Sequence, residues 1–509
     1  MLIVYPPVSK PCEPPLGIAR LAGALSAKNI EYDLVDANIE GMRWLIKNTA
    51  PLNDRWTARA IKNIDINIKH IKDAHLFKNI ARYKKAVSEI NKVLGIKAAS
   101  RGIRITLSDY EDKNLSPIKS TDLVHAATHF EENLFYGYFS ERLKGIIEKK
   151  DWRVIGISIN YLSQALCAFS IMGFLRHRYP DKKIIIGGSL ITSWMREKDR
   201  CHLFNSLVDH IVTGQGEIPL LKILGKKANP NIRFMPCYEP FDQDLYLSPG
   251  IVIPYNTSTG CYWGRCTFCP ERAEGNMYTQ ISPQDALQEL NAIIDTTRPS
   301  LIHITDNALS PAMLNAITKN PLMVPWYGFA RINKDLLDMH RCMALKKSGC
   351  VMLKLGVESG DQSVLDKMNK GIAIEDVGIV LKNLKEAGIS TYIYLLFGTP
   401  WETIESARKT LDFVVRNHNS IDFINIAIFN LPLNSPDAKG LKTQGFYNGD
   451  LSLYEDFIHP KAWDRLSVRR FIEKEFKRHP IINPIIQRQP PFFTSNHAPF
   501  FAMAQGKVC

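Results

Sequence analysis

The stretch Gly260-Cys-Tyr-Trp-Gly-Arg-Cys-Thr-Phe-Cys-Pro270 contains three cysteines, Cys261, Cys266 and Cys269, within nine residues. Three thiolates so close together on one loop can converge on one metal centre. A [4Fe–4S] cluster normally takes four ligands, and the next cysteines, Cys342 and Cys350, are far away in sequence. The triad therefore indicates a cluster with one iron left open for a small molecule. The alternatives are three unrelated buried thiols or a zinc site, although zinc usually shows a second, separated ligand pair.

The composition excludes several classes of protein. The chain has 509 residues, 45% of them hydrophobic, which is enough for two to four domains with apolar cores. It has no run of eighteen apolar residues, so we expect no transmembrane helix, and Met1–Pro7 lacks the basic region of a signal peptide. Ten cysteines, the last at Cys509, are no disulfide framework in so long a chain. We therefore expect a reducing cytoplasm and no membrane partner.

The positive charge of the chain is concentrated in one segment. The net charge is +13, and the stretch from Arg43 to Arg104 holds fifteen lysines and arginines against four acidic residues. Such an excess favours an anionic partner, such as nucleic acid, a phosphorylated substrate or an anionic membrane surface. The lysines alternate with apolar residues at helical spacing, so the alternative is a solvated helix face.

Strands alternate with helices through residues 1–228, which predicts an α/β domain with a doubly wound, Rossmann-like parallel sheet. A basic helical insertion at about 42–150 interrupts it. Such sheets bind ligands beyond the carboxyl ends of their strands, where glycines fall in this chain. The predicted strands are Leu2–Tyr5, Tyr32–Ala37, Val154–Asn160, Lys183–Ile186 and His210–Thr213.

A proline-containing stretch, 229–250, is a predicted linker to a second region of strand–helix alternation at 251–430. Six strand–helix units with the cysteines after the first strand predict a partial (βα)6 TIM-type barrel, whose functional loops gather at its C-terminal face. Residues 431–509 are proline-rich and less regular, and we expect them to cap the barrel or line a substrate site. The predicted barrel strands are Ile251–Tyr255, Leu301–Thr305, Pro325–Ala330, Met352–Gly356, Thr391–Phe397 and Phe423–Phe429.

The cysteine loop and the strand–helix units after it resemble the radical S-adenosylmethionine (SAM) enzymes, and the block before it resembles the cobalamin-binding domain of their B12-dependent class. The resemblance covers nearly the whole chain except the 42–150 insertion and much of the C-terminal tail. It implies that Cys261, Cys266 and Cys269 hold a [4Fe–4S] cluster whose open iron is chelated by SAM. The usual motif has three residues between the first two cysteines, whereas this chain has four, and we expect Gly264 to absorb the extra residue.

The resemblance also implies contacts to SAM from other loops. In Leu355-Gly-Val-Glu-Ser-Gly360, Glu358 and Ser359 would contact its polar groups; the alternative is a strand-end glutamate that caps a helix. In Leu396-Phe-Gly-Thr-Pro-Trp-Glu402, Gly398 would permit close approach of the backbone to the adenine. The remaining predicted contacts are Phe268 near the adenine, Asp306 facing the amino group, and Arg331, which pairs with a carboxylate or forms a surface salt bridge.

The resemblance to the cobalamin-binding domain lies in the first block. Many such domains carry Asp-x-His-x-x-Gly, whose histidine coordinates cobalt, and this chain has Asp36-Ala-Asn-Ile-Glu-Gly41 at the matching strand end. Asn38 takes the histidine position, so we expect any bound cobalamin to lack imidazole coordination. The alternative is a doubly wound domain with an unrelated or lost ligand. Further residues that resemble the cobalamin loops are Ser158, Gln164, Gly187, Gly188, Gly214 and Glu217.

The resemblance implies reductive cleavage of SAM to a 5′-deoxyadenosyl radical and a methyl group delivered by methylcobalamin. We therefore expect a B12-dependent radical SAM enzyme that C-methylates a small-molecule or peptide substrate and takes electrons from a flavodoxin- or ferredoxin-like donor. The alternatives are a radical SAM cyclase or rearrangement enzyme, an RNA-modifying enzyme of the methylthiotransferase type, and a non-catalytic cobalamin or cluster sensor. The basic segment favours RNA, but the chain lacks a second cysteine triad before the barrel and a recognisable RNA-binding module.

Overall fold

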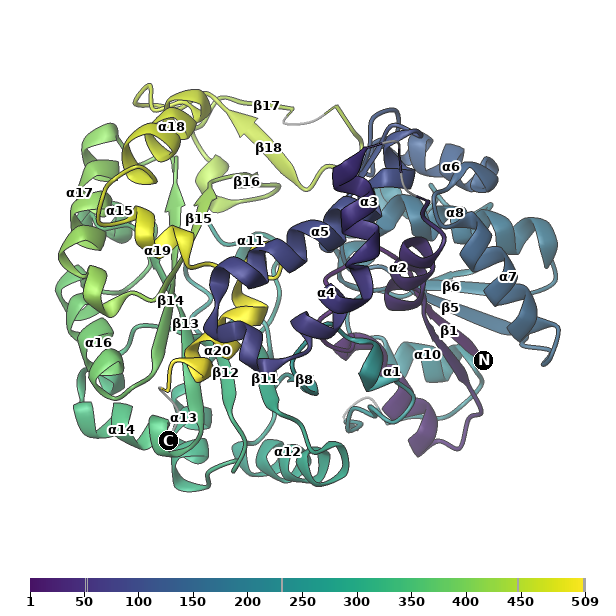
Figure 1. Cartoon of the computed structure of the whole chain (residues 1–509), viewed down its shortest axis with the longest axis horizontal. Coiled ribbons are helices and arrows are strands. Elements are labelled where there is room, and N and C mark those ends of the chain that lie inside the picture. The colour runs from purple at the N-terminus through teal and green to yellow at the C-terminus, as the bar shows by residue number, and fades with distance from the viewer. Residues whose placement is uncertain (51, 53, 230–231, 446–447, 507–509) are drawn as a thin grey trace. The chain divides into compact units, whose positions relative to one another are not determined.

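The computed structural model describes residues 1–50, 52, 54–229, 232–445 and 448–506, so Cys509 and short parts of the predicted linker and C-terminal region lie outside the described residues. The chain divides into two compact units (Figure 1). The first comprises residues 1–73, 81–248 and 447–453, and the second comprises residues 74–80, 249–446 and 454–509. In the described part of the chain, no helix is both long and apolar enough to cross a bilayer.

The first unit contains a parallel sheet of five strands in the order β2-β1-β5-β6-β7. This is the flavodoxin-type doubly wound order, in which the direction of winding reverses between β1 and β5. The prediction of an α/β doubly wound sheet is thereby confirmed, and ligands of such sheets bind at the reversal point. The strands are β1 (Leu2–Tyr5), β2 (Asp33–Asp36), β5 (Val154–Ser158), β6 (Lys183–Gly187) and β7 (His210–Ile211).

Helices follow the strands of this sheet, and the most buried of them is α8 (Leu162–Arg178). Gly173 of α8 allows another helix, α6 (Ser120–Thr128), to pack very closely, because a Cβ at Gly173 would lie 1.8 Å from the carbonyl oxygen of Ala127. The other helices after the strands are α1 (Leu16–Ala27), α2 (Ala37–Lys47), α9 (Ser189–Trp194) and α10 (Glu217–Ile223).

The predicted basic insertion is mostly helical and also contains a short antiparallel hairpin. Its longest helix, α5 (Ile80–Ala99), buries Val87, Ile90 and Leu94 on one side and exposes Lys85 on another. This division is typical of an amphipathic helix with a solvated face. The other elements are α3 (Arg55–Lys62), α4 (Ile64–Ile71), β3 (Ile103–Ile105), β4 (Tyr110–Asp112), α6, and α7 (Tyr136–Ile147).

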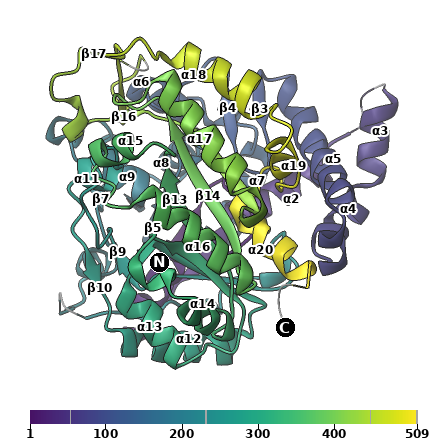
Figure 2. The ribbon, with the colours of Figure 1, turned by 90° about the vertical axis from the view of Figure 1, so that its left-hand side faces the viewer.

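The second unit contains six parallel strands in the order β8-β11-β12-β13-β14-β15, which confirms the predicted partial barrel. Helix α14 (Met339–Lys347) packs on β13, and α16 (Ile374–Glu386) packs on β14, as Figure 2 also shows. The strands are β8 (Val252–Tyr255), β11 (Leu301–Leu309), β12 (Trp326–Ala330), β13 (Cys350–Glu358), β14 (Ser390–Phe397) and β15 (Phe423–Ile428). Other helices between or after the barrel strands are α12 (Pro283–Thr297), α13 (Pro311–Lys319), α15 (Gln362–Lys367) and α17 (Ile404–Arg416).

The described residues of the C-terminal region add a small sheet and several helices to the second unit. Helix α20 (Thr494–Ala504) packs on β13 and β14, and also on the short helix η1 (Ala74–Lys78). Phe77 of η1 lies 4.9 Å from Phe501 between ring centroids, which is why residues 74–80 belong to this unit. The remaining elements are β16 (Leu431–Pro432), β17 (Thr443–Gly445), β18 (Tyr454–Phe457), α18 (Arg465–Phe471) and α19 (Asn483–Gln487).

Candidate functional site

The cysteine loop lies at the carboxyl end of β8, after the two-residue strand β9 (Ser258–Thr259). Gly260 begins the loop with a φ of +72°, and a Cβ there would lie 2.7 Å from the carbonyl oxygen of Met277. Glycine is therefore required at this turn. Gly264, in the four-residue spacer, has a φ of +58°, and Cys269 precedes the first turn of α11 (Pro270–Ala273). The three cysteines thus share one loop that is shaped by two left-handed glycines.

One thiol of this loop, that of Cys266, lies beside positively charged groups. Cys266 is buried, and an N–H of Arg331 points to its Sγ at 3.8 Å. Burial raises the pKa of the Cys266 thiol, whereas the charges of Lys370 and Arg331 lower it, and burial raises the pKa of Cys269 to about 11. Among the described residues, no three Cys, His, Asp or Glu side chains are gathered closely enough to hold a metal ion. Three thiols on one loop, one of them beside two cations, are nevertheless a donor set that fits an anionic, thiolate-ligated cluster.

Trp263 fastens this loop to a neighbouring turn, a contact that sequence reasoning missed. Its Nε1 donates a hydrogen bond to the carbonyl oxygen of Asn369 at 3.1 Å. The guanidinium of Arg331 lies 4.3 Å from the ring centroid and also donates to the carbonyl oxygen of Lys370. The predicted SAM contact Arg331 therefore has a sulfur, a carbonyl oxygen and an indole ring as its described partners.

Glu358, the last residue of β13, has the strained geometry that is common at functional sites. Its φ is +66°, a left-handed conformation that is uncommon for a residue other than glycine. Its carboxylate forms an ion pair with Lys370 at 2.7 Å, with little exposure of either side chain, and the same ammonium lies 5.7 Å from the ring centroid of Phe268. Asp361, not Glu358, caps the helix that follows, so the helix-capping alternative is wrong.

Two of the predicted SAM contacts are occupied by hydrogen bonds within the protein. Asp306 is buried in β11 and accepts from the backbone N–H and hydroxyl of Thr257 and from the hydroxyl of Ser258, all at 2.7 Å or less. It thereby holds the chain between β8 and the cysteine loop. Ser359 is fully buried, and its hydroxyl lies 3.4 Å from that of Thr410 in α17. Both residues therefore fix the loops of the site.

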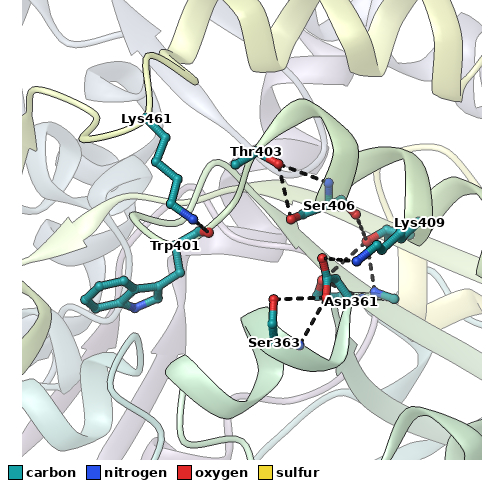
Figure 3. A network of polar contacts seen from close by, with 10 residues as sticks. Asp361, Ser363, Trp401, Thr403, Ser406, Lys409 and Lys461 are labelled. Carbon is teal, nitrogen blue, oxygen red and sulfur yellow. Dashed lines mark hydrogen bonds and ion pairs between the residues drawn. The ribbon is translucent and has the colours of Figure 1, made fainter.

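Helix α17 also holds the loop after β13, as Figure 3 shows. Asp361 in this loop accepts from the backbone N–H of Ser363 at 3.0 Å and from Lys409 of α17 at 3.1 Å. In the same view, Lys461 donates to the carbonyl oxygen of Trp401, in the loop after β14, at 2.9 Å. The loops after both strands are thus tied to neighbouring segments.

Gly398, at the end of β14, has a φ of +82°, and its N–H donates to Glu402. Glu402 is fully buried and also accepts from the indole N–H of Trp463 at 2.8 Å, a partner that no sequence signal indicated. A hollow of about 30 Å³ is lined by Gly398 and by residues of the C-terminal region, including His459 and Trp463. The predicted adenine contact therefore borders a small cavity within the second unit.

We expect the stability of the chain to depend on pH through Glu402. Burial raises its pKa from 4.5 to about 7, and its Oε1 has no hydrogen-bond partner among the described residues. A raised pKa means that the folded state holds the proton more tightly, so stability is lost as pH rises from about 4.5 to about 7. Glu402→Gln removes this loss, so its free energy of unfolding should rise relative to the wild type by up to about 3 kcal/mol across that range. Urea unfolding at several pH values tests this, and parallel pH profiles would contradict it.

At the reversal point of the first unit, Gln164 joins the loops after β1 and β5. Its Oε1 accepts from the backbone N–H of Asn160 at 2.9 Å, and its Nε2 donates to the carbonyl oxygen of Pro6 at 2.7 Å. Asn38 is also buried, in the first turn of α2, and its side-chain oxygen accepts from the backbone N–H of Ser9 at 2.8 Å. Both predicted cobalamin residues thus shape the loops at this edge of the sheet.

Exposed apolar side chains follow β5, and glycines end and follow the neighbouring strand β6. This surface fits the apolar face of a corrin ring. Tyr161 and Leu162 are 56% and 37% exposed. Ser158 ends β5, Gly187 ends β6, and Gly188 follows with a φ of +110°. Gly214, after β7, has a φ of +71° and open space where a Cβ would lie, whereas Glu217 is buried in an ion pair with Arg20.

We expect Gln164→Glu to destabilise the first unit. The new carboxylate would face the carbonyl oxygen of Pro6, to which the amide now donates, and neither group could supply the hydrogen. A buried acceptor pair of this kind costs about 2–4 kcal/mol. Urea unfolding at pH 8, followed in parallel for Gln164→Glu and the wild type, measures the difference. Equal unfolding midpoints would show that this amide does not hold the two loops together.

Comparison with known proteins relates this geometry to a protein family. Residues 255–414 match the model of the radical SAM superfamily. An uncharacterized methyltransferase of Pyrococcus horikoshii is 23% identical over 318 residues, which are 54% of this chain and 66% of that relative. The chain thus spans just under two thirds of that relative's length.

Two solved structures match most of the chain. The radical SAM methyltransferase TsrM of Kitasatospora setae, with cobalamin and a [4Fe–4S] cluster bound, has a TM-score of 0.52 at 15% identity and covers 88% of this chain and 81% of its own. It is also known with its tryptophan substrate and a SAM analogue. The cobalamin-dependent SAM radical enzyme OxsB with aqua-cobalamin has a TM-score of 0.55 at 14% identity and covers 93% of this chain and 67% of its own. At these identities, the comparison shows a common fold.

Proposed function

We propose that this radical SAM enzyme, which has the fold of the cobalamin-dependent class, methylates an unactivated carbon of a small-molecule or peptide substrate. The observation that carries the proposal is the cysteine loop at the carboxyl end of β8, with Arg331 and Lys370 beside the buried thiol of Cys266. The doubly wound sheet of the first unit supports the cobalamin part of the proposal.

Cys261, Cys266 and Cys269 would hold the cluster as thiolates. Arg331 and Lys370 favour the loss of the Cys266 proton, because their positive charges stabilise the thiolate. When bound, the cluster would supply the electron that cleaves SAM, and cobalamin would carry the methyl group. Glu358, held at the strand end by Lys370, would accept hydrogen bonds from polar groups of SAM.

In the first unit, Gln164 fixes the loops after β1 and β5, so the apolar surface of Tyr161 and Leu162 is presented on a defined scaffold. We assign the cobalamin to this edge of the sheet. Position 38 is an asparagine, so it would supply no imidazole to cobalt, and its side-chain oxygen accepts from the backbone N–H of Ser9.

The substrate and the electron donor are the remaining parts of the proposal. TsrM is known with tryptophan as its substrate, which favours a small molecule as the substrate of this chain as well. The electron would come from a flavodoxin- or ferredoxin-like protein, and thiolate ligands of this kind persist best in a reducing cytoplasm.

Anaerobic reconstitution tests the proposal. We expect about four irons and one cobalamin per chain, together with reductive cleavage of SAM. A chain that binds iron but takes up no cobalamin would overturn the methyltransferase proposal. A chain that binds neither iron nor SAM would overturn the radical SAM activity as well.

A further inference from the structure

The extra residue between Cys261 and Cys266 lies in the spacer that contains Trp263, whose indole contacts the turn 368–371. The ring lies so close to Gly371 that a Cβ there would come within 2.1 Å of it. Gly371 also has a φ of +66°, so both the space and the backbone conformation favour glycine at this position. The indole N–H bonds to the carbonyl oxygen of Asn369 in the same turn.

Arg331 connects this indole to a predicted iron ligand. Its guanidinium lies over the Trp263 ring, and one of its N–H groups points to the Cys266 sulfur. The backbone of the loop is attached independently, since the N–H of Thr267 donates to the carbonyl oxygen of Met368 at 3.0 Å. All these contacts are between the protein's own atoms, so they do not require a bound metal.

We propose that Trp263 is a positioning residue that locks the cysteine loop, residues 261–269, onto the turn 368–371, and that the four-residue spacer gives the indole the reach for this contact. We call the contacts of Trp263 with Asn369, Gly371 and Arg331 the indole lock. The role of these contacts, which is to hold the thiols in place for the cluster, rests on the proposed function. The lock itself belongs to the protein without the cluster.

Hydrogen–deuterium exchange of the cluster-free full chain measures the lock directly. In Trp263→Ala, the amides of residues 261–269 should exchange faster by a factor on the order of ten or more, because the ring, its hydrogen bond and its guanidinium contact are all lost. Trp263→Phe keeps a ring over which Arg331 can lie and loses the N–H bond, so its increase should be smaller, about two- to tenfold. Trp56→Ala, which removes an exposed indole of α3, should leave this loop unchanged.

Gly371→Ala tests the same contact from the other side, and Gly275→Ala is its matched control. Gly275 has a φ of +65° with open space where a Cβ would lie, so alanine there adds backbone strain without displacing a ring. Only Gly371→Ala should accelerate exchange in the loop. When Trp263 is already replaced by alanine, Gly371→Ala should increase the exchange rate of the loop little more than Gly275→Ala does. The indole ring that Gly371→Ala would displace is absent from that protein. Additive effects of the two substitutions would overturn the lock.

Iron retention separates this inference from the proposed function. After reconstitution, Trp263→Ala should lose iron to a chelator faster than the wild type, and Trp263→Phe should restore much of the retention. If the wild type bound no iron but the exchange results held, the proposed function would fail and the lock would stand. If Trp263→Ala matched the wild type in both exchange and iron retention, the lock would be wrong.

Discussion

Cys266→Ser should reduce the iron bound after anaerobic reconstitution from about four per chain to nearly none, and reductive cleavage of SAM should fall to background. The serine hydroxyl keeps its proton at neutral pH and is a poor iron ligand, so only two thiolates would remain on the loop. Iron and sulfide analysis of the purified protein measures the first effect, and the methionine released from SAM measures the second.

The control for this substitution is Cys201→Ser, which changes an exposed cysteine of the first unit. It should bind iron as the wild type does. If Cys266→Ser kept its full iron and still cleaved SAM, the assignment of the cluster to this loop would be wrong. The same result for Cys261→Ser and Cys269→Ser would extend that conclusion to the whole triad.

Lys370→Met should destabilise the cluster-free chain by about 3–5 kcal/mol, because it leaves the Glu358 carboxylate without its counter-charge in a mostly buried position. The ion pair spans 2.7 Å, and the Lys370 and Glu358 side chains are only 8% and 12% exposed. The double variant Lys370→Met/Glu358→Gln should recover most of the loss, since no uncompensated charge remains. Urea unfolding of the wild type, Lys370→Met, Glu358→Gln and the double variant gives the coupling energy between the two side chains.

Lys382→Met is the matched control for Lys370→Met. Lys382 pairs with Glu386 across one turn of α16 at 3.8 Å, and both side chains are well exposed. Such a pair contributes about 0.5 kcal/mol or less. Similar losses for the two lysines would contradict the view that the pair between Lys370 and Glu358 is a buried structural feature of the site.

The strands of the two parallel sheets could be predicted because they are short apolar runs bounded by turn residues, although β11 continues four residues beyond its predicted end at Thr305. Val154–Ser158, Ser390–Phe397 and Phe423–Ile428 all lie within one or two residues of their predicted bounds. The hairpin of β3 and β4 was not predicted, because two strands of three residues carry too few side chains for a period of two to emerge.

The candidate site was predictable where its chemistry is local in sequence, as with the three cysteines of one loop. The partners of these residues were not, because the contacts join distant parts of the chain. The hydrogen bond from Trp263 to Asn369 joins residues 106 positions apart in the sequence, and the bond from Trp463 to Glu402 joins residues 61 positions apart. Residue type alone also does not show that the Asp306 carboxylate accepts hydrogen bonds from Thr257 and Ser258, since these contacts depend on where the strands end.

The short segment 74–80 gives the chain an interlaced connectivity. It packs with the second unit, while both of its flanks belong to the first, and residues 448–453 pack with the first unit although the chain after them belongs to the second. A fragment that starts at residue 249 would lack Phe77, so the aromatic surface of α20 at Phe500 and Phe501 would lose its partner. A fragment that ends at residue 248 would lack Asp450, which accepts from the backbone N–H of Ser120 at 2.8 Å. Neither unit is therefore encoded by one contiguous piece of the gene, and exchanging either one by recombination would require at least three separate segments.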